Sequence, residues 1–462
     1  MKNSKLPVLG LSSLPLVFSA CADGQQTASR EDKPNVIFIL ADDMGYCDLS
    51  CYGNVEITTP NIDRLAATGT HFTNAYAGSA ISSPSRCALM TGKHSGHTTI
   101  RDNFCNAGGL TGLKNGAPIR RMHLTQDDYT LANLMHDAGY RTCLVNKWHL
   151  DGFNPGAGPL DRGFDEFYGW LISSGQSNSP YYYPAKRFNN RDLSPVTANE
   201  HEQQVRHNTD ISTDDAIAFI NRNVDNPFFL YLAFDAPHEP YNINDTHWYD
   251  EKDWDANSKR YASLISHMDE AVGRLIAELD RLGLRENTIV FFASDNGAAV
   301  QAPLELLNCN GSFRGRKGIV YEGGIRVPLI VNCPGKVKEQ ELLNQVFFPD
   351  IMPTLAALSG TKAPEWTDGI DISPLFFGQQ VETDNRMLYW EFPGKQIAAR
   401  KGKWKIVQMR EQPFELYDLE NDPFETTDLA ASEPEILEQM VAEAKTMHRP
   451  TPNWPLPGEF EN

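Results

Sequence analysis

Four short apolar runs in this 462-residue sequence each end at a cluster of acidic, amide or basic residues. Continuous apolar runs of this length are typical of strands buried on both faces of a parallel sheet, and segments with helical periodicity lie between them. The sequence therefore predicts an α/β fold with a large, mostly parallel sheet flanked by helices. The four predicted strands are residues 35–40, 142–145, 228–234 and 288–293.

Two predicted helices and a change in the sequence pattern near residue 371 divide the chain further. Apolar residues recur every three or four positions over 261–279, and residues 130–138 form a second predicted helix closed by Gly139. From residue 371 the sequence becomes short alternating segments followed by a helical stretch at 434–447. We therefore expect a catalytic domain over 33–370 and a C-terminal subdomain over 371–462 with a small antiparallel sheet. Its predicted strands are 387–391, 396–399, 404–408 and 414–417.

The polar clusters that follow the strands predict one shared site. Ligands of open α/β sheets bind beyond the carboxyl ends of the strands, where such clusters converge. Asp42-Asp43 and Asp295-Asn296 offer only oxygen ligands, which favour Ca²⁺ or Mg²⁺ over Zn²⁺. Acidic pairs at strand ends also serve as helix caps, so either pair alone leaves both interpretations open.

The N-terminus has the layout of an export signal over residues 1–21. Lys2 and Lys5 precede an apolar stretch at 6–18, and small residues lead to Cys21. A lipid anchor at Cys21 and plain secretion are both compatible with this pattern, so we expect a bacterial periplasmic protein or an outer-membrane lipoprotein. No segment reaches the roughly 18 apolar residues of a membrane span. The net charge of -19 disfavours a nucleic-acid partner.

The remaining seven cysteines lack CxxC pairs, so they predict neither a zinc site nor a disulfide framework.

The most informative motif runs from Ser82 to Gly92. Pro84 suits the first turn of a helix and Gly92 its end, which places Ser82 at a helix N-terminus that favours an anion. By itself the segment is also compatible with a capped surface turn. The motif is Ser82-Ser83-Pro84-Ser85-Arg86-Cys87-Ala88-Leu89-Met90-Thr91-Gly92.

This motif resembles the signature of the type I, formylglycine-dependent sulfatases, which belong to the alkaline-phosphatase-like superfamily. The resemblance implies that fold and a formylglycine (3-oxoalanine) made from Ser82 by a serine-type maturation enzyme before export. It also implies one Ca²⁺, with Mg²⁺ as the less favoured ion, held by Asp42, Asp43, Ser82, Asp295 and Asn296. Asn146 and Asp151 stand where the family has glycines, and neither change removes a catalytic side chain.

The resemblance also implies roles for the charged residues. Arg86 and Lys147 would hold the hydrated formylglycine, and Lys317 and His238 would bind the sulfate oxygens. His238 is the candidate acid for the leaving group, and His149 is the candidate base that breaks down the sulfated hydrate.

The substrate is the least determined part of the prediction. Export and the resemblance favour sulfated carbohydrates, with a broad-range arylsulfatase as the alternative. A phosphomonoesterase or phosphodiesterase that uses unmodified Ser82 is a second alternative, and an inactive glycan-binding surface protein is a third. His97, Arg101 and Asn103 are candidates for the leaving-group pocket, although they also fit an ordinary polar loop. The stretch 173–191 contains three consecutive tyrosines that could stack on a sugar ring.

Overall fold

The computed structural model describes Met1 and residues 33–460, apart from 115–116, 151–153, 173–180 and 393–395. The predicted export signal, Cys21 and Asp151 lie outside these residues. Among the described helices, none combines the length and the apolar character needed to cross a bilayer.

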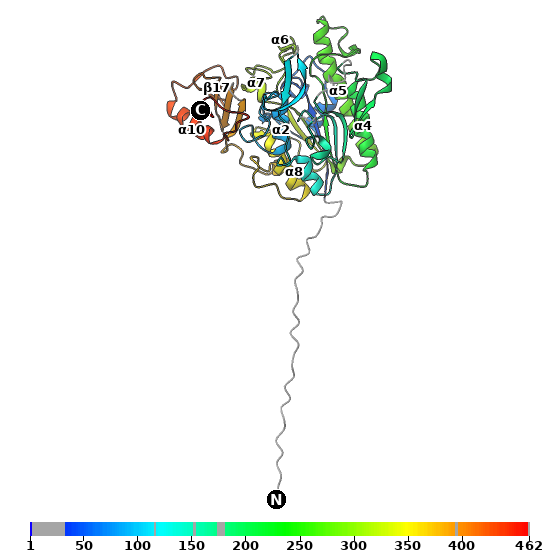
Figure 1. The fold of residues 1–462 in the computed structure, drawn as a ribbon, viewed down its shortest axis with the longest axis horizontal. Helices are drawn as coiled ribbons and strands as arrows, with labels where there is room; N and C mark the ends of the chain where they lie inside the picture. The colour runs from blue at the N-terminus through cyan, green and yellow to red at the C-terminus, as the bar shows by residue number, and fades with distance from the viewer. Residues whose placement is uncertain (2–32, 115–116, 151–153, 173–180, 393–395, 461–462) are drawn as a thin grey trace.

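A ten-stranded mixed sheet forms the centre of the protein (Figure 1). Its five central strands are parallel and contain the four predicted strands, which confirms the predicted fold class. Antiparallel partners extend the sheet on both sides, so it is less uniformly parallel than the sequence suggests. In sheet order the strands are β13 (Gln340–Leu342), β2 (Thr70–Phe72), β12 (Leu329–Asn332), β11 (Thr288–Ser294), β1 (Asn35–Ala41), β10 (Phe228–Ala233), β6 (Arg141–Lys147), β7 (Glu166–Trp170), β8 (Lys186–Asn189) and β9 (Asp192–Pro195).

Helices cover both faces of this sheet because its strands are apolar on both sides. Alternate residues of β1 enter two separate cores: Phe38 belongs to one and Ile39 to the other. The first core packs against α2 (Ser82–Thr91), α3 (Leu131–Asp137), α8 (Ile351–Ser359) and α9 (Ser373–Phe376). The second packs against α1 (Pro60–Ala67), α4 (Asn208–Arg222) and α5 (Ala256–Arg281). The predicted helices at 130–138 and 261–279 correspond to α3 and α5.

Shorter elements complete the large domain. A hairpin of β4 (Gly109–Lys114) and β5 (Ala117–Arg121) and a pair of β3 (Ala75–Tyr76) and β14 (Val346–Phe347) stand apart from the main sheet. Two one-turn helices are α6 (Leu304–Leu307) and α7 (Glu322–Ile325). Short 3-10 helices occur at Ser50–Tyr52, Pro159–Asp161, Thr197–Glu202, His247–Tyr249, Arg285–Asn287 and Phe348–Asp350.

The C-terminal part is a four-stranded antiparallel meander with one helix, α10 (Pro434–Thr446), against it. Its strands are β15 (Leu388–Phe392), β16 (Gln396–Lys401), β17 (Trp404–Met409) and β18 (Glu415–Asp418). The other face of the meander packs on the large domain, where Trp390 contacts Tyr76 and Phe347. Leu375 and Phe376 lie in the core of the large sheet. α9, which follows the predicted boundary at 371, therefore packs with the large domain.

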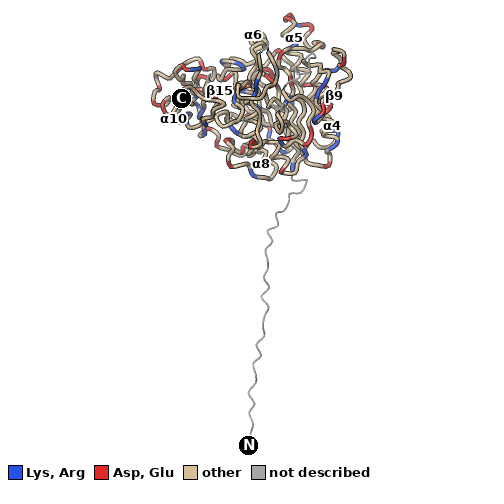
Figure 2. Tube along the Cα trace, in the orientation of Figure 1, with Lys and Arg blue, Asp and Glu red and all other residues tan. Residues whose placement is uncertain are grey.

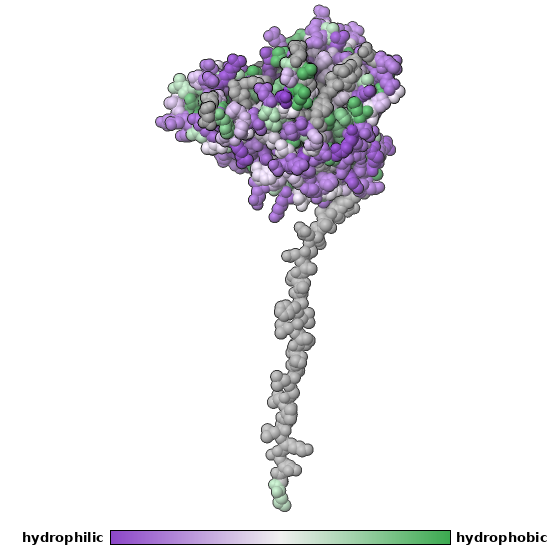
Figure 3. Space-filling model, in the orientation of Figure 1, coloured by the Kyte–Doolittle hydropathy of each residue, from purple (hydrophilic) through white to green (hydrophobic). Residues whose placement is uncertain are grey.

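The surface is strongly polar and carries charges of both signs. Figure 2 shows basic and acidic residues interspersed over the exposed loops and helices, and Figure 3 shows apolar residues in small patches on a mainly hydrophilic face. The seven described cysteines all carry free thiols.

A buried carboxyl beside the sheet makes stability depend on pH. Burial raises the pKa of Asp48 to about 7, although its side chain accepts hydrogen bonds from Tyr261 and the N–H of Gly45. In the unfolded chain this carboxyl loses its proton near its usual pKa of 3.8. Its contribution to the free energy of unfolding is thus fully present below that value and is lost as the pH rises through 7.

We therefore expect Asp48→Asn, which does not titrate, to gain about 2–4 kcal/mol relative to the wild type between pH 4 and pH 8. Urea unfolding of both proteins at several pH values measures this difference. The exposed variant Asp127→Asn is the control and should show a nearly constant difference. A difference for Asp48→Asn that does not change with pH contradicts the assignment.

Candidate active site

Ser82 lies at the start of α2, in the interior of the protein. It is only 1% exposed, and every residue of α2 is buried. The helix ends where the sequence predicts, at Gly92, whose φ of 65° belongs to the left-handed region that glycine tolerates. The Ser82 hydroxyl lies 3.2 Å from Asp42 Oδ1 and 3.3 Å from Asn296 Oδ1. The two predicted acidic clusters therefore meet at Ser82.

The register of the sheet explains this meeting. β1 and β11 are adjacent parallel strands in which Ala41 pairs with Ser294, so the residues after each strand lie side by side. The Asp43 N–H donates to Asp295 Oδ1 at 3.0 Å, and Asn296 Nδ2 donates to Asp43 Oδ1 at 2.9 Å. Asp42, Asp43, Asp295 and Asn296 are all inaccessible to solvent.

Three cationic side chains face these three carboxylates. Lys147 Nζ contacts Asp42 Oδ2 at 2.5 Å, and Lys317 Nζ contacts Asp43 Oδ2 at 2.6 Å. Arg86 Nη2 lies 2.8 Å from Asp295 Oδ2 and 3.3 Å from Asp42 Oδ1. The fixed charges of the cluster therefore add to zero in formal terms.

The cations set the protonation of the acids. Burial alone would raise the pKa of Asp42, but the nearby Lys147, His238 and Arg86 hold it well below its usual value. Asp43 is affected in the same direction, since Lys317 and His238 outweigh the effect of burial on its pKa. Burial raises the pKa of Asp295 to about 6, with Arg86 opposing the change. Asp42 and Asp43 are thus the firmly ionised members of the cluster.

The two predicted histidines approach from different loops. His238, which follows β10, places Nε2 3.5 Å from Asp43 Oδ2 and is partly exposed. His149 is buried behind Lys147, and its backbone carbonyl accepts a hydrogen bond from the Ser83 hydroxyl at 2.8 Å. Burial, together with Lys147 and Arg121, holds the pKa of His149 well below its usual value. Its imidazole is therefore neutral, and its Nε2 accepts a hydrogen bond from Arg121 at 3.1 Å.

The departure from the family pattern at Asn146 has a local explanation. Asn146 has φ of 81°, a left-handed conformation that glycine adopts freely and asparagine tolerates better than most residues. Its side chain also accepts a hydrogen bond from Asn208 at 3.0 Å. Gly169 lies against its backbone so closely that a Cβ there would be 2.2 Å from the Asn146 oxygen. This packing positions the turn that carries Lys147 and His149.

The oxygen atoms around Ser82 fit a hard divalent cation. Neighbouring ligands bound to Ca²⁺ at about 2.3–2.6 Å lie roughly 3.0–3.6 Å apart, and the distances from Ser82 Oγ to Asp42 and Asn296 fall in that range. Asn296 uses its amide nitrogen on Asp43 and the carbonyl of Gly297, which leaves its Oδ1 directed at Ser82. A divalent cation held here would give the charge-balanced cluster a net positive charge, which suits an anionic substrate.

The three predicted substrate residues lie in different environments. Asn103 lies close to Ser82, because its Oδ1 accepts the N–H of the adjacent Ser83 at 2.9 Å. Arg101 is buried and contacts Glu391 of the C-terminal meander at 2.5 Å. The structure does not bring Arg101 to Ser82, because its guanidinium joins the two parts of the protein.

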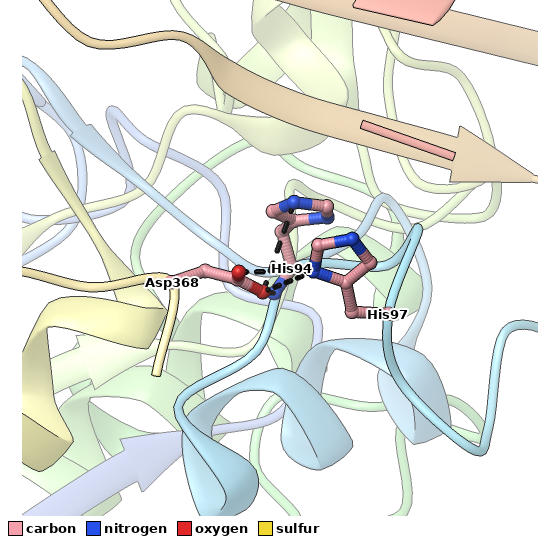
Figure 4. A group of neighbouring side chains, drawn as sticks. All are labelled: His94, His97 and Asp368. Atoms are coloured by element: carbon pink, nitrogen blue, oxygen red, sulfur yellow. Dashed lines mark hydrogen bonds and ion pairs between the residues drawn. The ribbon is translucent and has the colours of Figure 1, made fainter. Parts of the chain in front are cut away.

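His97 belongs to a separate hydrogen-bonded group (Figure 4). Its Nδ1 lies 2.9 Å from Asp368 Oδ1, and the ring of His94 lies beside it with the centroids 4.1 Å apart. His94 Nδ1 accepts the N–H of Gly96 at 3.2 Å, so Nε2 carries the proton and faces Asp368. This group fixes the loop after α2. The structure gives His97 no contact with the cluster around Ser82.

Sequence reasoning missed two residues that contact the site. Arg121 Nη1 lies 3.1 Å from His149 Nε2. The Tyr182 hydroxyl donates to the carbonyls of Asp235 and His238 at 2.9 and 2.7 Å, which holds the His238 loop. Tyr182 lies in the tyrosine run that was considered for sugar stacking, but it is buried and has this supporting role. Arg121 follows a segment without clear periodicity, so no pattern in the sequence connects it to His149.

Ser82 at a helix N-terminus, beside two acidic clusters at the ends of adjacent parallel strands, is the arrangement expected of a hydrolase of the alkaline-phosphatase-like fold. The sequence model described as "Sulfatase" matches residues 34–361, and "N-sulphoglucosamine sulphohydrolase, C-terminal" matches 311–449. The chain belongs to the sulfatase family and is a sulfuric ester hydrolase.

Named relatives and a solved structure agree with this assignment. N-acetylgalactosamine-6-sulfatase of Canis lupus familiaris is 32% identical over 83% of this chain and 73% of its own length. Arylsulfatase A of Homo sapiens is 32% identical over 80% of this chain and 74% of its own length. The crystal structure of Ps i-CgsB in complex with k-i-k-neocarrahexaose superimposes with a TM-score of 0.77 at 30% identity, over 90% of this chain and 92% of the other.

Proposed function

We propose that this sulfatase hydrolyses sulfate monoesters of carbohydrates, using formylglycine formed from Ser82 and one Ca²⁺ ion. The observation that carries the proposal is the placement of the Ser82 hydroxyl between Asp42 and Asn296, with Arg86, Lys147 and Lys317 around the acids. The names of the relatives support a sugar substrate, since N-acetylgalactosamine-6-sulfatase is named for a sugar and Ps i-CgsB was solved with an oligosaccharide.

Ser82 by itself is a weak nucleophile, because among the described residues its hydroxyl contacts only Asp42 and Asn296 and no neutral base. A hydrated aldehyde at this position would supply two hydroxyls. One would attack sulfur as the S–O bond to the alcohol breaks; loss of the proton from the other would re-form the carbonyl and release sulfate, and water would then restore the hydrate. We assign the acceptance of that proton to His149, whose backbone carbonyl contacts the Ser83 hydroxyl beside Ser82.

The cations act on the sulfate group. Lys317 is the least buried of the three, so its ammonium can reach a sulfate oxygen while it remains close to Asp43. His238 is also partly exposed on the same side of Asp43, where it can donate a proton to the departing alcohol oxygen. Arg86 is fully buried and instead fixes Asp295 and Asp42. A bound Ca²⁺ would lower the pKa of the nucleophilic hydroxyl and offset charge on sulfate.

The same geometry weighs against the other candidate functions. Phosphatases of this superfamily that use two metals need further Asp and His ligands, and here the corresponding space holds Lys147 and Lys317. An inactive glycan-binding protein would have no need for three buried carboxylates matched to two buried cations and one partly buried cation, since buried charges are costly to desolvate. An arylsulfatase of broad range remains the alternative substrate class.

Mass spectrometry of the peptide containing Ser82 tests the proposed modification. In protein made together with a serine-type maturation enzyme, we expect a peptide two hydrogens lighter than the encoded sequence, and hydrolysis of sulfated saccharides only by that form. Unmodified Ser82 in fully active protein would favour the phosphatase-like alternative instead.

Metal removal should abolish this activity. Without a divalent cation the nucleophilic hydroxyl is less acidic, so we expect dialysis against a chelator to lower kcat at least about 100-fold. Added Ca²⁺ should restore the rate, with Mg²⁺ less effective. The melting temperature should fall at the same time, because the ion binds only the folded protein. Full activity in metal-free protein would contradict the proposed site.

We further propose that the protein is exported, on the basis of the N-terminal pattern of basic and apolar residues. Fractionation of the source bacterium, with and without Cys21→Ser, tests whether the protein reaches the periplasm and whether it carries a lipid anchor.

A further inference from the structure

One segment beside the active site is basic and lacks acidic residues. Residues 103–126 contain no aspartate or glutamate, although the whole protein has a net charge of -19. The segment carries Lys114, Arg120 and Arg121, and most of it is the hairpin of β4 and β5. An acid-free, basic segment in an acidic protein creates a local field that attracts anions.

The stretch from residue 103 to residue 121 contacts the residues around Ser82 at both of its ends. At its start, Asn103 accepts the N–H of Ser83, the residue after the nucleophile, at 2.9 Å. At its end, Arg121 Nη1 donates to the Asn103 carbonyl at 2.8 Å and lies 3.1 Å from His149 Nε2. Arg121 is only partly buried. Its guanidinium therefore contacts His149 on one side and is accessible to solvent on the other.

Arg121 and an exposed aromatic ring form one surface. The Arg121 guanidinium carbon lies 4.7 Å from the centre of the Phe104 ring, and Phe104 is 52% exposed. Leu110 and Leu113 of β4 are also exposed apolar side chains, at 56% and 69% exposure. An exposed aromatic ring can stack on the apolar face of a pyranose, and the guanidinium fork matches the geometry of a sulfate or carboxylate group.

We propose that Phe104 and Arg121 form a substrate subsite that binds a sugar ring together with a second anionic group, sulfate or carboxylate, beyond the sulfate that is cleaved. The inference rests on the proposed carbohydrate sulfatase function and adds to it a preference for polyanionic glycans. The acid-free segment attracts the polyanion. Phe104 stacks on the sugar ring, and Arg121 pairs with the second anionic group close to His149.

The ratio of kcat/KM for two substrates tests this subsite. The substrates are a disaccharide with two sulfates and the same disaccharide with only the cleaved sulfate. The specificity ratio is kcat/KM for the disulfated disaccharide divided by kcat/KM for the monosulfated one. We expect Arg121→Gln to lower this ratio at least about tenfold, since a charge-assisted hydrogen bond is lost only with the disulfated sugar. Arg121→Lys should recover part of the ratio because the charge remains. A third disaccharide, with one sulfate and one uronate, shows whether carboxylate serves as well as sulfate.

Arg141→Gln is the matched control, because Arg141 is an exposed arginine at the opposite end of β6 from Lys147. Its ratio should match that of the wild type. If Arg121→Gln lowers kcat for both sugars and leaves the ratio unchanged, Arg121 only supports His149 and the subsite is refuted. A fall of the ratio in Arg141→Gln as large as in Arg121→Gln also overturns the proposal.

Binding to Ser82→Ala separates this inference from the proposed function. Calorimetry should show that Ser82→Ala binds the disulfated sugar at least about tenfold more tightly than the monosulfated sugar, and that adding Arg121→Gln removes the difference. Equal affinities for the two sugars refute the subsite. Failure of the mature wild-type protein to hydrolyse any sulfated sugar refutes the proposed function, whatever the binding preference.

Discussion

Ser82→Ala should lower kcat/KM for a sulfate ester at least about 10⁴-fold, because the nucleophile is lost and no described side chain can take its place. The assay uses protein made together with a serine-type maturation enzyme. The fold should be retained, since the hydroxyl makes only two long hydrogen bonds, worth together about 1–2 kcal/mol of stability.

Ser85→Ala is the control for this variant. Ser85 lies on the same helix, and its hydroxyl accepts the N–H of Gly78, away from the acidic cluster. It should lose a similar amount of stability in urea unfolding but keep most of the activity. Residual turnover above about 1% in Ser82→Ala, with an intact circular dichroism spectrum, would mean that another group performs the attack.

Lys317→Gln should lower kcat by about 10²–10³-fold, because a fixed cation that binds sulfate oxygens is lost where negative charge develops. Lys317 Nζ lies 2.6 Å from Asp43, and its own pKa is raised: burial lowers it, but Asp43 and Asp42 more than compensate. The ammonium is therefore permanently charged. Steady-state kinetics on a sulfated sugar gives kcat and KM separately.

The adjacent Arg316→Gln is the matched control, because Arg316 is exposed on the same loop and contacts none of the three carboxylates in the described structure. It should keep kcat within about threefold of the wild type, as expected for a surface substitution. Lys317→Arg should recover only part of the rate, since the guanidinium is larger and planar. A loss of less than tenfold in Lys317→Gln would assign sulfate binding to other groups.

The central fold could be predicted because its strands are buried on both faces. The apolar run at 35–40 differs from β1 by only one residue, and the helical stripe at 261–279 lies within α5. The short strands beside the central five could not be predicted in the same way. β2 and β12 are three and four residues long and pair antiparallel, so neither length nor alternation distinguishes them from loops.

The meeting of the polar clusters could be predicted where residues directly follow strands. The register of β1 and β11 brings Asp42 and Asp295 together, and the order of polar clusters in the sequence already indicated this. Prediction failed for Arg101, whose partner Glu391 lies 290 positions away in the sequence. Long-range ion pairs of this kind leave no local pattern. Arg121 was missed for a different reason: it lies only 28 positions from His149, but the segment around it shows no periodicity that connects the two.

The burial of Ser82 determines when, relative to folding, this residue can be modified. A side chain that is 1% exposed, on a helix with every residue buried, offers no surface to a second enzyme. Any oxidation of this serine must therefore act on the newly made, still extended polypeptide. Once the sheet has closed over α2, an unconverted molecule would be fixed in that state until it unfolds.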